Sequence, residues 1–170
     1  RVQTHYQSAI TVLHPDSDAV AAHVAEHGAY AFYESLPLRQ ACCQLRKVQP
    51  LQRYLHGKSA WITGQRREQS QTRTELQAQE YDTQFGLEKF NPLRDWNTEQ
   101  VWEIIRALAI PYNPMHDQGY PSIGCDPCTR AIRPGEDLRA GRWWWEQRHS
   151  LECGLHASPL SQSSTTQELS

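Results

Sequence analysis

Ala60-Trp61-Ile62-Thr63 (AWIT) is a short apolar run that ends in the polar, basic loop Gly64-Gln65-Arg66-Arg67-Glu68-Gln69-Ser70. Short apolar runs bounded by turn residues are typical of buried strands. Two further segments fit the same description. Ala9–Leu13 (AITVL) ends at His14-Pro15-Asp16, and Phe85–Pro92 is a short extended segment. The sequence therefore predicts three strands at well-separated positions.

Helical patterns lie between and after these strands. A helix is predicted to begin at Asp16–Asp18 and to end near Gly28, because acidic residues favour the first turn and glycine the end. Leu38–Leu55 also reads as helical, with an interruption or kink around Pro50. Strands that alternate with helices indicate an α/β fold with a parallel sheet and flanking helices.

The clearest helix is predicted to begin at Asn97 or Thr98 and to end before Pro111. Its apolar face consists of Val101, Trp102, Ile104, Ile105, Leu108 and Ala109. A loop-rich stretch with many Pro and Gly residues follows from Tyr112 to Gly135. The last residues, Ala157–Ser170, are mostly Ser, Thr and Gln, which predicts a disordered, flexible tail.

Composition narrows the possible functions. The net charge of −2 and the pI near 6.5 argue against bulk binding of DNA or RNA, so an anionic ligand would need local basic residues. No apolar run approaches the ~20 residues that cross a bilayer, and no signal-peptide pattern opens the chain. We therefore expect a cytoplasmic protein, not a membrane protein. Because residue 1 is Arg and not Met, we also expect an N-terminal truncation.

The five cysteines are the most informative residues. Their odd number, without a secretion signal, favours metal binding or thiol chemistry over a disulfide framework. Cys42-Cys43 lies on a predicted helix, and Cys125-Asp126-Pro127-Cys128 lies in a loop flanked by Gly and Pro. The two pairs together form a candidate Cys₄ metal site.

Two metal centres compete for these cysteines. Zinc usually takes spaced pairs, whereas adjacent helical residues project about 100° apart, which is awkward for one ion. A [4Fe–4S] cluster presents separate iron atoms at its corners, so each of two adjacent thiolates reaches its own iron. This geometry favours the cluster. The alternative for Cys42 and Cys43 is that they are ordinary buried core thiols.

At these positions the sequence resembles the assimilatory adenylyl-sulfate (APS) reductases, which are relatives of the PAPS reductases. The motifs that carry the resemblance occur in the family's order: Cys42-Cys43-Gln44-Leu45-Arg46-Lys47-Val48, Trp61-Ile62-Thr63-Gly64-Gln65-Arg66-Arg67, Pro111-Tyr112-Asn113-Pro114, Gly119-Tyr120-Pro121-Ser122-Ile123-Gly124-Cys125-Asp126-Pro127-Cys128-Thr129 and Glu152-Cys153-Gly154-Leu155-His156. The likeness runs from about Ile10 to His156.

The resemblance implies an adenine-nucleotide alpha-hydrolase-like fold and a reductase domain over residues 1–156, with 157–170 as the tail. It implies a [4Fe–4S] cluster on Cys42, Cys43, Cys125 and Cys128. The family's Ser-Gly-Gly-x-Asp-type loop, which holds the phosphate side of the nucleotide, has no counterpart here. This departure places part of the nucleotide pocket in doubt and agrees with the expected truncation.

By resemblance, Cys153 is the catalytic nucleophile. Its thiolate would attack APS to give a thiosulfonate and AMP, and thioredoxin would then release sulfite. The alternative is an idle surface thiol. His156 would lower the pKa of that thiol or order the Glu152–His156 box, although a lone histidine is often only structural. The cluster is expected to act structurally and electrostatically.

Basic residues are expected to hold the phosphosulfate group. By resemblance, Lys47 pairs with the sulfate end, and Arg139 and Arg142 supply paired hydrogen bonds. Arg66 and Arg67 are weaker candidates for the same role, and at least one fits a surface salt bridge instead. Without the motif, Lys47 would read as a solvated helix lysine.

Three alternatives remain open from the sequence. The Trp143-Trp144-Trp145 segment would stack on adenine or a partner, or anchor a helix in the core. A second alternative is that the substrate is PAPS, which carries a 3′-phosphate that APS lacks. A third alternative is that the chain is a non-enzymatic Cys₄ zinc module that serves as a binding scaffold. A homo-oligomer is also left open.

Overall fold

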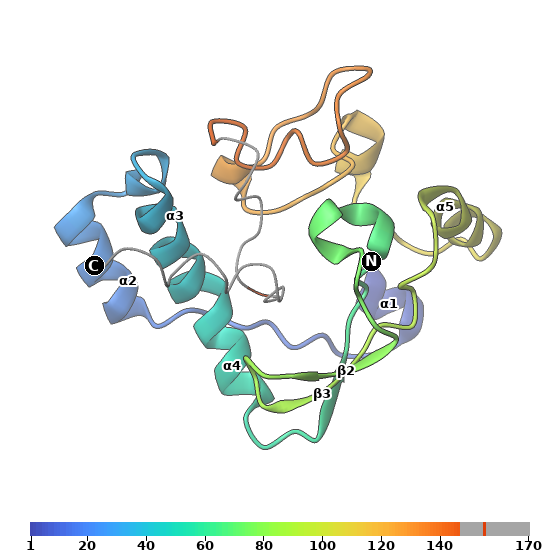
Figure 1. Ribbon diagram of the computed structural model, residues 1–170, viewed down its shortest axis with the longest axis horizontal. Helices are drawn as coiled ribbons and strands as arrows, with labels where there is room; N and C mark the ends of the chain where they lie inside the picture. Colours follow the sequence, from blue (N-terminus) through green and yellow to red (C-terminus); the bar gives the residue numbers. More distant parts are fainter. Residues whose placement is uncertain (147–154, 156–170) are drawn as a thin grey trace, which may run out of the picture.

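The structure is a computed structural model that describes residues 1–146 and Leu155. Figure 1 shows two helical groups on opposite sides of the molecule, with a small sheet beneath and a long loop segment above. Cys153, His156 and the predicted tail at 157–170 lie outside the described residues.

The sheet contains β1 (Ala60–Ile62), β2 (Gln79–Asp82) and β3 (Leu87–Phe90), in the order β1-β3-β2. β1 runs parallel to β3 and β2 runs antiparallel to it, so the sheet is mixed. The predicted strands at 60–63 and 85–92 are confirmed. β2 was missed because its sequence, Gln-Glu-Tyr-Asp, is too polar to read as a strand.

The prediction of a strand at Ala9–Leu13 is wrong. Residues 8–16 form no regular element, and the side chains of Ile10 and Val12 are 51% and 67% exposed. A strand needs a neighbour to complete its hydrogen bonds, and within residues 1–146 the three sheet strands pair only with one another. An apolar run alone therefore did not produce a strand. The α/β class is confirmed, with a parallel pair inside a mixed sheet.

The N-terminal helices are α1 (Val2–Tyr6) and α2 (Ser17–His27). The start and end predicted for α2 are confirmed. The Asp16 carboxylate accepts a hydrogen bond from the Ala19 amide at 2.9 Å. Gly28 ends the helix with a φ of 91°, a backbone conformation that residues with a Cβ rarely adopt.

One long helical segment carries the first cysteine pair. After the short turn η1 (Ala31–Tyr33) come α3 (Leu36–Cys43), the π-helical turn η2 (Gln44–Val48) and α4 (Gln49–Leu55). The interruption was predicted at Pro50, and it lies just before that residue. Because the proline ring would clash with the carbonyl one α-helical turn earlier, the wider π turn fits this sequence.

α5 (Thr98–Ala107) begins where the sequence predicts. Asn97 accepts from the Gln100 amide at 2.8 Å, and the Gln100 side chain accepts from the Asn97 amide at 2.9 Å, which completes a capping box. The helix ends at Ala107, before Pro111, because the chain turns at Ala109 with a positive φ of 50°. No residue of α5 is buried, although its apolar face borders a cleft described below.

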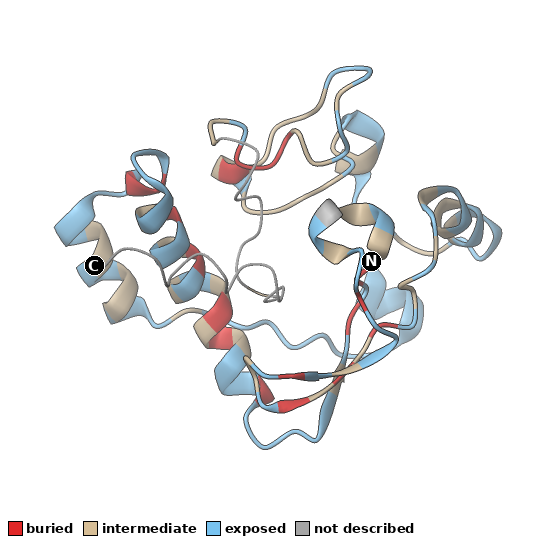
Figure 2. Ribbon diagram, viewed as in Figure 1, coloured by how far each residue is buried: buried red, intermediate tan, exposed pale blue. Residues whose placement is uncertain are grey.

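Short turns complete the described chain: η3 (Arg67–Gln69), η4 (Gln71–Arg73), η5 (Pro114–Gln118) and η6 (Asp126–Cys128). Figure 2 shows that buried residues are few and scattered over these elements and the sheet. Phe32, Cys128 and Trp143 form a buried cluster that joins η1, η6 and the chain before residue 147. No helix in the described part of the chain is long and apolar enough to span a membrane.

Candidate functional site

The structure brings the two cysteine pairs together. Cys128 belongs to the buried cluster with Phe32 and Trp143, and Cys42 and Cys125 pack against that cluster. Cys43 is buried on α3, and none of these four described cysteines forms a disulfide. η6 therefore lies against the end of α3, although some 80 residues separate them in the sequence.

The electrostatics of Cys128 also reflect this gathering. Burial, and after it the like charges of the neighbouring Cys125, Cys43 and Cys42, together raise the pKa of its thiol to about 11. Lys47, on the π turn, acts in the opposite direction. A cation thus lies within electrostatic reach of the thiols, as the spacing from Cys43 predicts.

Within residues 1–146 and Leu155, no group of three or more His, Cys, Asp or Glu side chains is arranged around a single metal position. The four thiols gather at one place without converging on one ion. A polar atom next to them is unusual: Trp143 Nε1 is buried and has no hydrogen-bond partner among the described residues. Such a donor leaves room for an acceptor at the thiol site.

Trp143 is the centre of this region. It is 1% exposed, and the guanidinium carbons of Arg39 and Arg142 lie 4.6 and 4.5 Å from its ring centroid. Its φ of 45° is rare for a residue with a side chain, so surrounding contacts must hold the backbone there. Trp143 is therefore buried in the core, as one of the two alternatives predicts, but the segment that carries it is not a helix. Trp144, in contrast, is 42% exposed.

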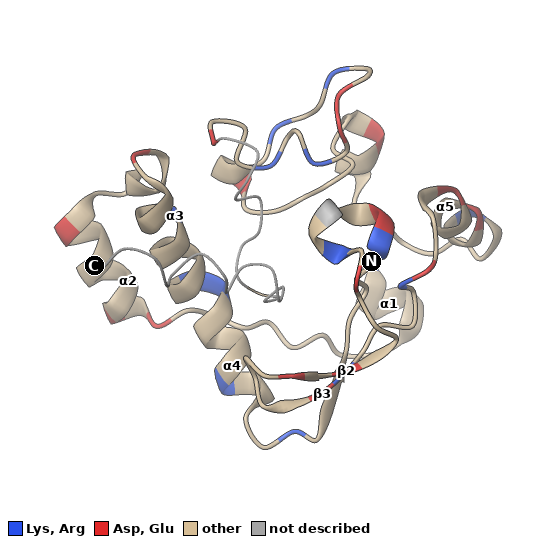
Figure 3. Cartoon of the chain, in the orientation of Figure 1, with Lys and Arg blue, Asp and Glu red and all other residues tan. Residues whose placement is uncertain are grey.

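A cleft of about 750 Å³ lies beside the cysteine site. Its walls come from the loop after β1, from α5, and from the segments at 112–123 and 138–142. Its charged side chains are mainly cationic: Arg66, Arg73, Arg106, Arg139 and Arg142, with Asp117 as the one carboxylate among the lining residues. In Figure 3 basic residues lie along the long loop segment and the facing turn. The cleft suits an anionic ligand.

Arg142 connects this cleft to the cysteine site. Its side chain lines the cleft and donates hydrogen bonds to Ser122 Oγ at 3.4 Å and to the Ile123 carbonyl at 3.2 Å. Arg142 is 7% exposed, and the Nε of its guanidinium has no partner in the described chain. Gly124 lies directly opposite it, and an added Cβ there would force the guanidinium to shift.

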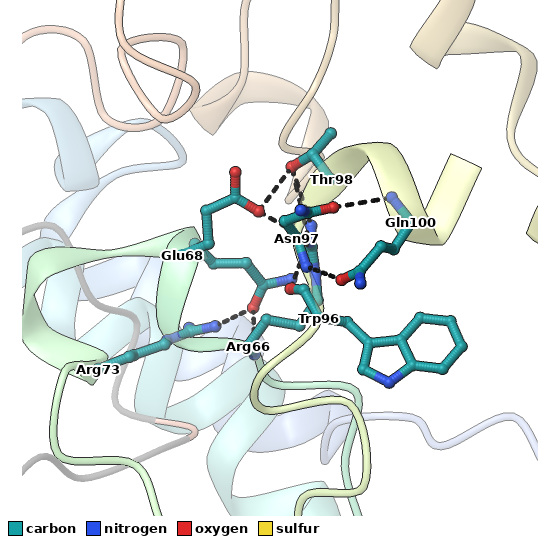
Figure 4. A network of polar contacts seen from close by, with 8 residues as sticks. Arg66, Glu68, Arg73, Trp96, Asn97, Thr98 and Gln100 are labelled. Atoms are coloured by element: carbon teal, nitrogen blue, oxygen red, sulfur yellow. Dashed lines mark hydrogen bonds and ion pairs between the residues drawn. The ribbon is translucent and has the colours of Figure 1, made fainter. Parts of the chain in front are cut away.

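The remaining predicted cations are divided between cleft and surface. Arg139 lines the cleft, and Lys47 does not. Arg66 also lines it and bonds to the Trp96 carbonyl at 3.3 Å, as well as to Glu68 and Thr98 (Figure 4). Arg67 instead pairs with Asp95 at 2.8 Å and bonds the Leu76 carbonyl. Both loop arginines thus form a salt bridge, and of the two only Arg66 also lines the cleft.

Sequence reasoning missed several residues of this region. Arg73 and Arg106 enter the cleft, and Arg73 is fixed by a 2.6 Å hydrogen bond to Gln69 (Figure 4). Arg39 and Glu146 form a buried ion pair beside Cys43. Glu146 directly follows the Trp-rich segment, and Arg39 lies one helical turn before Cys43, so a search for i, i+4 neighbours of the cysteines was the available signal.

Comparison with known proteins gives the family. The model of the phosphoadenosine phosphosulfate reductase domain matches residues 1–131. The chain is 57% identical over 161 residues to the adenosine 5′-phosphosulfate reductase of Burkholderia cepacia, which covers 95% of the chain and 64% of that relative. For the reductase of the same name from Allochromatium vinosum, the identity is 58% over 155 residues, which covers 91% of the chain and 60% of the relative.

The chain thus spans less than two thirds of the length of these two relatives. Among solved structures, the phosphate complex of phosphoadenylyl-sulfate (PAPS) reductase from Candida auris aligns with a TM-score of 0.58 and 32% identity, covering 72% of this chain and 58% of that one. The family match, the high identities and the shared fold agree: the chain belongs to the phosphoadenosine phosphosulfate reductase domain family.

Proposed function

We propose that this chain is the greater part of an enzyme that reduces APS to sulfite and AMP in sulfate assimilation. One observation carries the proposal: two chain segments that line the arginine-rich cleft continue directly into the thiol site. Ser122 and Ile123 line the cleft directly before Cys125, and Arg142 lines it directly before Trp143, which packs on Cys128. The names of the most similar relatives support APS as the substrate.

We further propose that Cys42, Cys43, Cys125 and Cys128 hold a [4Fe–4S] cluster. The donor set fits this group, because two adjacent helical thiols can each take a different iron while the C-x-x-C turn supplies the other two. The orphaned Trp143 Nε1 would find an acceptor in the sulfur atoms of such a cluster. When bound, the cluster would supply fixed charge and rigidity at the end of the cleft.

The chemistry itself is proposed for Cys153. Its thiolate attacks the sulfur of APS, an S–S bond forms, and the bond from that sulfur to the phosphate oxygen breaks with release of AMP. A dithiol protein of the thioredoxin kind then attacks Cys153 and expels sulfite. Its second thiol resolves the mixed disulfide, so the partner leaves oxidised and supplies both electrons.

The cleft arginines have a role in this first step. Guanidinium groups pair with phosphate and sulfate oxygens and offset the negative charge that moves onto the leaving AMP. Arg139 and Arg142 are the proposed contacts, with Arg66 as a further one, while Lys47 adds positive charge from the cysteine side. His156 is proposed to order the segment that carries Cys153.

The cluster is tested by changing its ligands. Cys42→Ser and Cys43→Ser should each abolish the brown colour and most of the bound iron and sulfide of the anaerobically purified chain, because each thiolate is assigned its own iron. Zinc analysis of the same samples covers the alternative of a zinc scaffold, in which native protein would be colourless with stoichiometric zinc. Full iron and sulfide in both serine variants would remove these residues from the site.

The nucleophile is tested by Cys153→Ser in a chain extended to the full length of its relatives. The variant should keep its iron and still bind nucleotide, because four other cysteines are assigned to the metal. It should form no protein-bound sulfite adduct by intact mass spectrometry. Sulfite production at near the native rate would contradict the mechanism.

PAPS is the second candidate substrate, since the family model and the Candida auris neighbour are both named for it. The two substrates differ only in the 3′-phosphate. Rates with APS and PAPS at matched concentrations, in the same extended chain, decide between them. A higher kcat/KM for PAPS would replace APS in the proposal.

A further inference from the structure

Arg39 and Glu146 form the most deeply buried ion pair that the described chain shows. The two side chains are 1% and 8% exposed. The guanidinium donates from Nε to Oε1 at 2.7 Å and from Nη2 to Oε2 at 3.0 Å, so the contact has the two-pronged geometry that arginine makes with carboxylates. The pair joins α3 to the end of the Trp-rich segment, 107 positions away in sequence.

Burying two charges is expensive, and such a pair persists only with good geometry and additional partners. Arg39 has two additional partners. Its guanidinium carbon lies 4.6 Å from the ring centroid of Trp143, and Cys43, one helical turn further along α3, interacts with it electrostatically. The guanidinium stays charged next to the thiol.

We propose that Arg39 is a positioning residue for the cysteine site, and that Glu146 and Trp143 hold its guanidinium in place. Arg39 precedes Cys43 by four residues on α3, so the two side chains project from the same face of that helix. From this position, held by Glu146, the guanidinium would donate a hydrogen bond to the Cys43 sulfur and fix the direction in which that thiolate points. The inference rests on the proposed cluster, in which Cys43 is a ligand.

Lys47 does not duplicate this role. It is half-buried and acts on Cys128 through its charge, whereas Arg39 is wholly buried and lies one helical turn before Cys43 on α3. Glu146 largely neutralises the charge of Arg39. The proposed contribution of Arg39 is therefore to orient the Cys43 side chain, and not to add net positive charge to the site. Partners of this kind commonly change metal affinity or activity about 10–100-fold when they are removed.

The chain contains a matched control for this pair. Arg130 and Glu136 form the same two-pronged contact, at 2.8 and 3.0 Å, in the loop after η6. Their side chains are 35% and 29% exposed, and the pKa of each is shifted by the other and not by a cysteine. Replacing this second pair therefore eliminates an ion pair of similar geometry and leaves the contacts of the cysteine site in place.

The decisive variant is the double substitution Arg39→Met with Glu146→Leu, which removes both charges together and leaves neither unpaired in the core. Such replacements are often neutral or stabilising. Iron release to a chelator, followed by loss of the brown absorbance, should become about 10–100-fold faster than in the native chain. Visible circular dichroism of the cluster should also change. Arg130→Met with Glu136→Leu should match the native chain in both measurements.

Two further variants separate position from folding. Arg39→Lys keeps the positive charge but loses the planar guanidinium that makes two parallel hydrogen bonds. This variant should therefore release iron faster than native protein and more slowly than the double variant. Glu146→Gln keeps the shape of the carboxylate and should also release iron faster, because the guanidinium loses its charged anchor. If the double variant fails to fold by far-ultraviolet circular dichroism, Glu146→Gln decides the question.

Each outcome has one meaning. A native chain that takes up no iron overturns the proposed cluster and this inference with it. A native chain that holds iron, together with a folded double variant that releases it at the native rate, overturns the role of Arg39 alone. The same conclusion follows if the Arg130–Glu136 control accelerates release as much, since the effect would then come from any lost ion pair.

Discussion

Arg139 and Arg142 enter the same cleft from different surroundings. Arg142 is buried, bonds Ser122 and the Ile123 carbonyl, and lies over Trp143, so it supports the walls as well as facing the cleft. Arg139 is half-buried, and its amide bonds the Asp137 carboxylate. A substitution at Arg139 therefore reports on ligand binding more directly than one at Arg142, where loss of affinity and loss of stability would occur together.

We predict that Arg139→Ala weakens APS binding by about 1.5–3 kcal/mol, the range for a lost hydrogen bond to a charged group. The measurement is calorimetric titration of the full-length extended chain. Arg67→Ala is the control, because Arg67 pairs with Asp95 and does not line the cleft. Equal affinity in the native and Arg139→Ala proteins would place this arginine outside the binding site, and an equal loss in Arg67→Ala would mean that overall charge is responsible.

At the scale of elements, local chemistry decided which predictions succeeded. The start of α2 follows from Asp16, and the start of α5 follows from Asn97 and Gln100, because these side chains cap the helix ends on their own. The strand predicted at Ala9–Leu13 failed because a strand depends on a neighbour that a short window does not contain. β2 is the converse case: β3 makes it a strand despite its polar sequence.

The loop after η6 is held by the Arg130–Glu136 pair. The hydrogen bond from Arg130 and a second one from the Arg133 amide lower the pKa of Glu136 to about 2, from an ordinary value of 4.5. Because the folded pKa is the lower one, the carboxylate stabilises the loop above pH 4.5, and this contribution is lost as the pH falls towards 2. We predict a carboxyl titration midpoint near 2 for Glu136 by nuclear magnetic resonance.

Arg130→Gln serves as the control for that titration. Removing the guanidinium should bring the Glu136 midpoint back towards 4.5. A native midpoint near 4.5 would mean that the pair does not persist in solution. A low midpoint that survives in Arg130→Gln would assign the shift to the Arg133 amide instead.

At the scale of the whole molecule, the candidate site could be predicted only in part. The cysteine pairs were readable because chemistry fixes their residue type and spacing, and their meeting in space agrees with that interpretation. Several charged residues of the site could not be predicted from the sequence: Arg39, Glu146, Arg73 and Arg106. Charged side chains are usually solvated, and only tertiary packing buries them or directs them into a cleft. Cys153 and His156 stay predictions.

Trp143 is where these distant segments meet, so its loss should affect the whole fold. We predict that Trp143→Ala lowers the free energy of unfolding by about 3–5 kcal/mol, as for other buried aromatic residues. Trp144→Ala, at a position that is 42% exposed, should cost about 1 kcal/mol or less. Denaturant unfolding of both variants gives the comparison. Similar losses in the two would mean that Trp143 is not the anchor described here.

The π turn at Gln44–Val48 has a consequence for chain length. An i→i+5 turn contains one residue more than an α-helical turn, so α3 and α4 amount to one helix with a single inserted residue. Deleting the exposed Gln44 would close the wide turn into an α-helical one, in which the Pro50 ring clashes with the carbonyl four residues before it. Between Cys43 and Pro50 the number of residues is therefore more constrained than the identity of several of them.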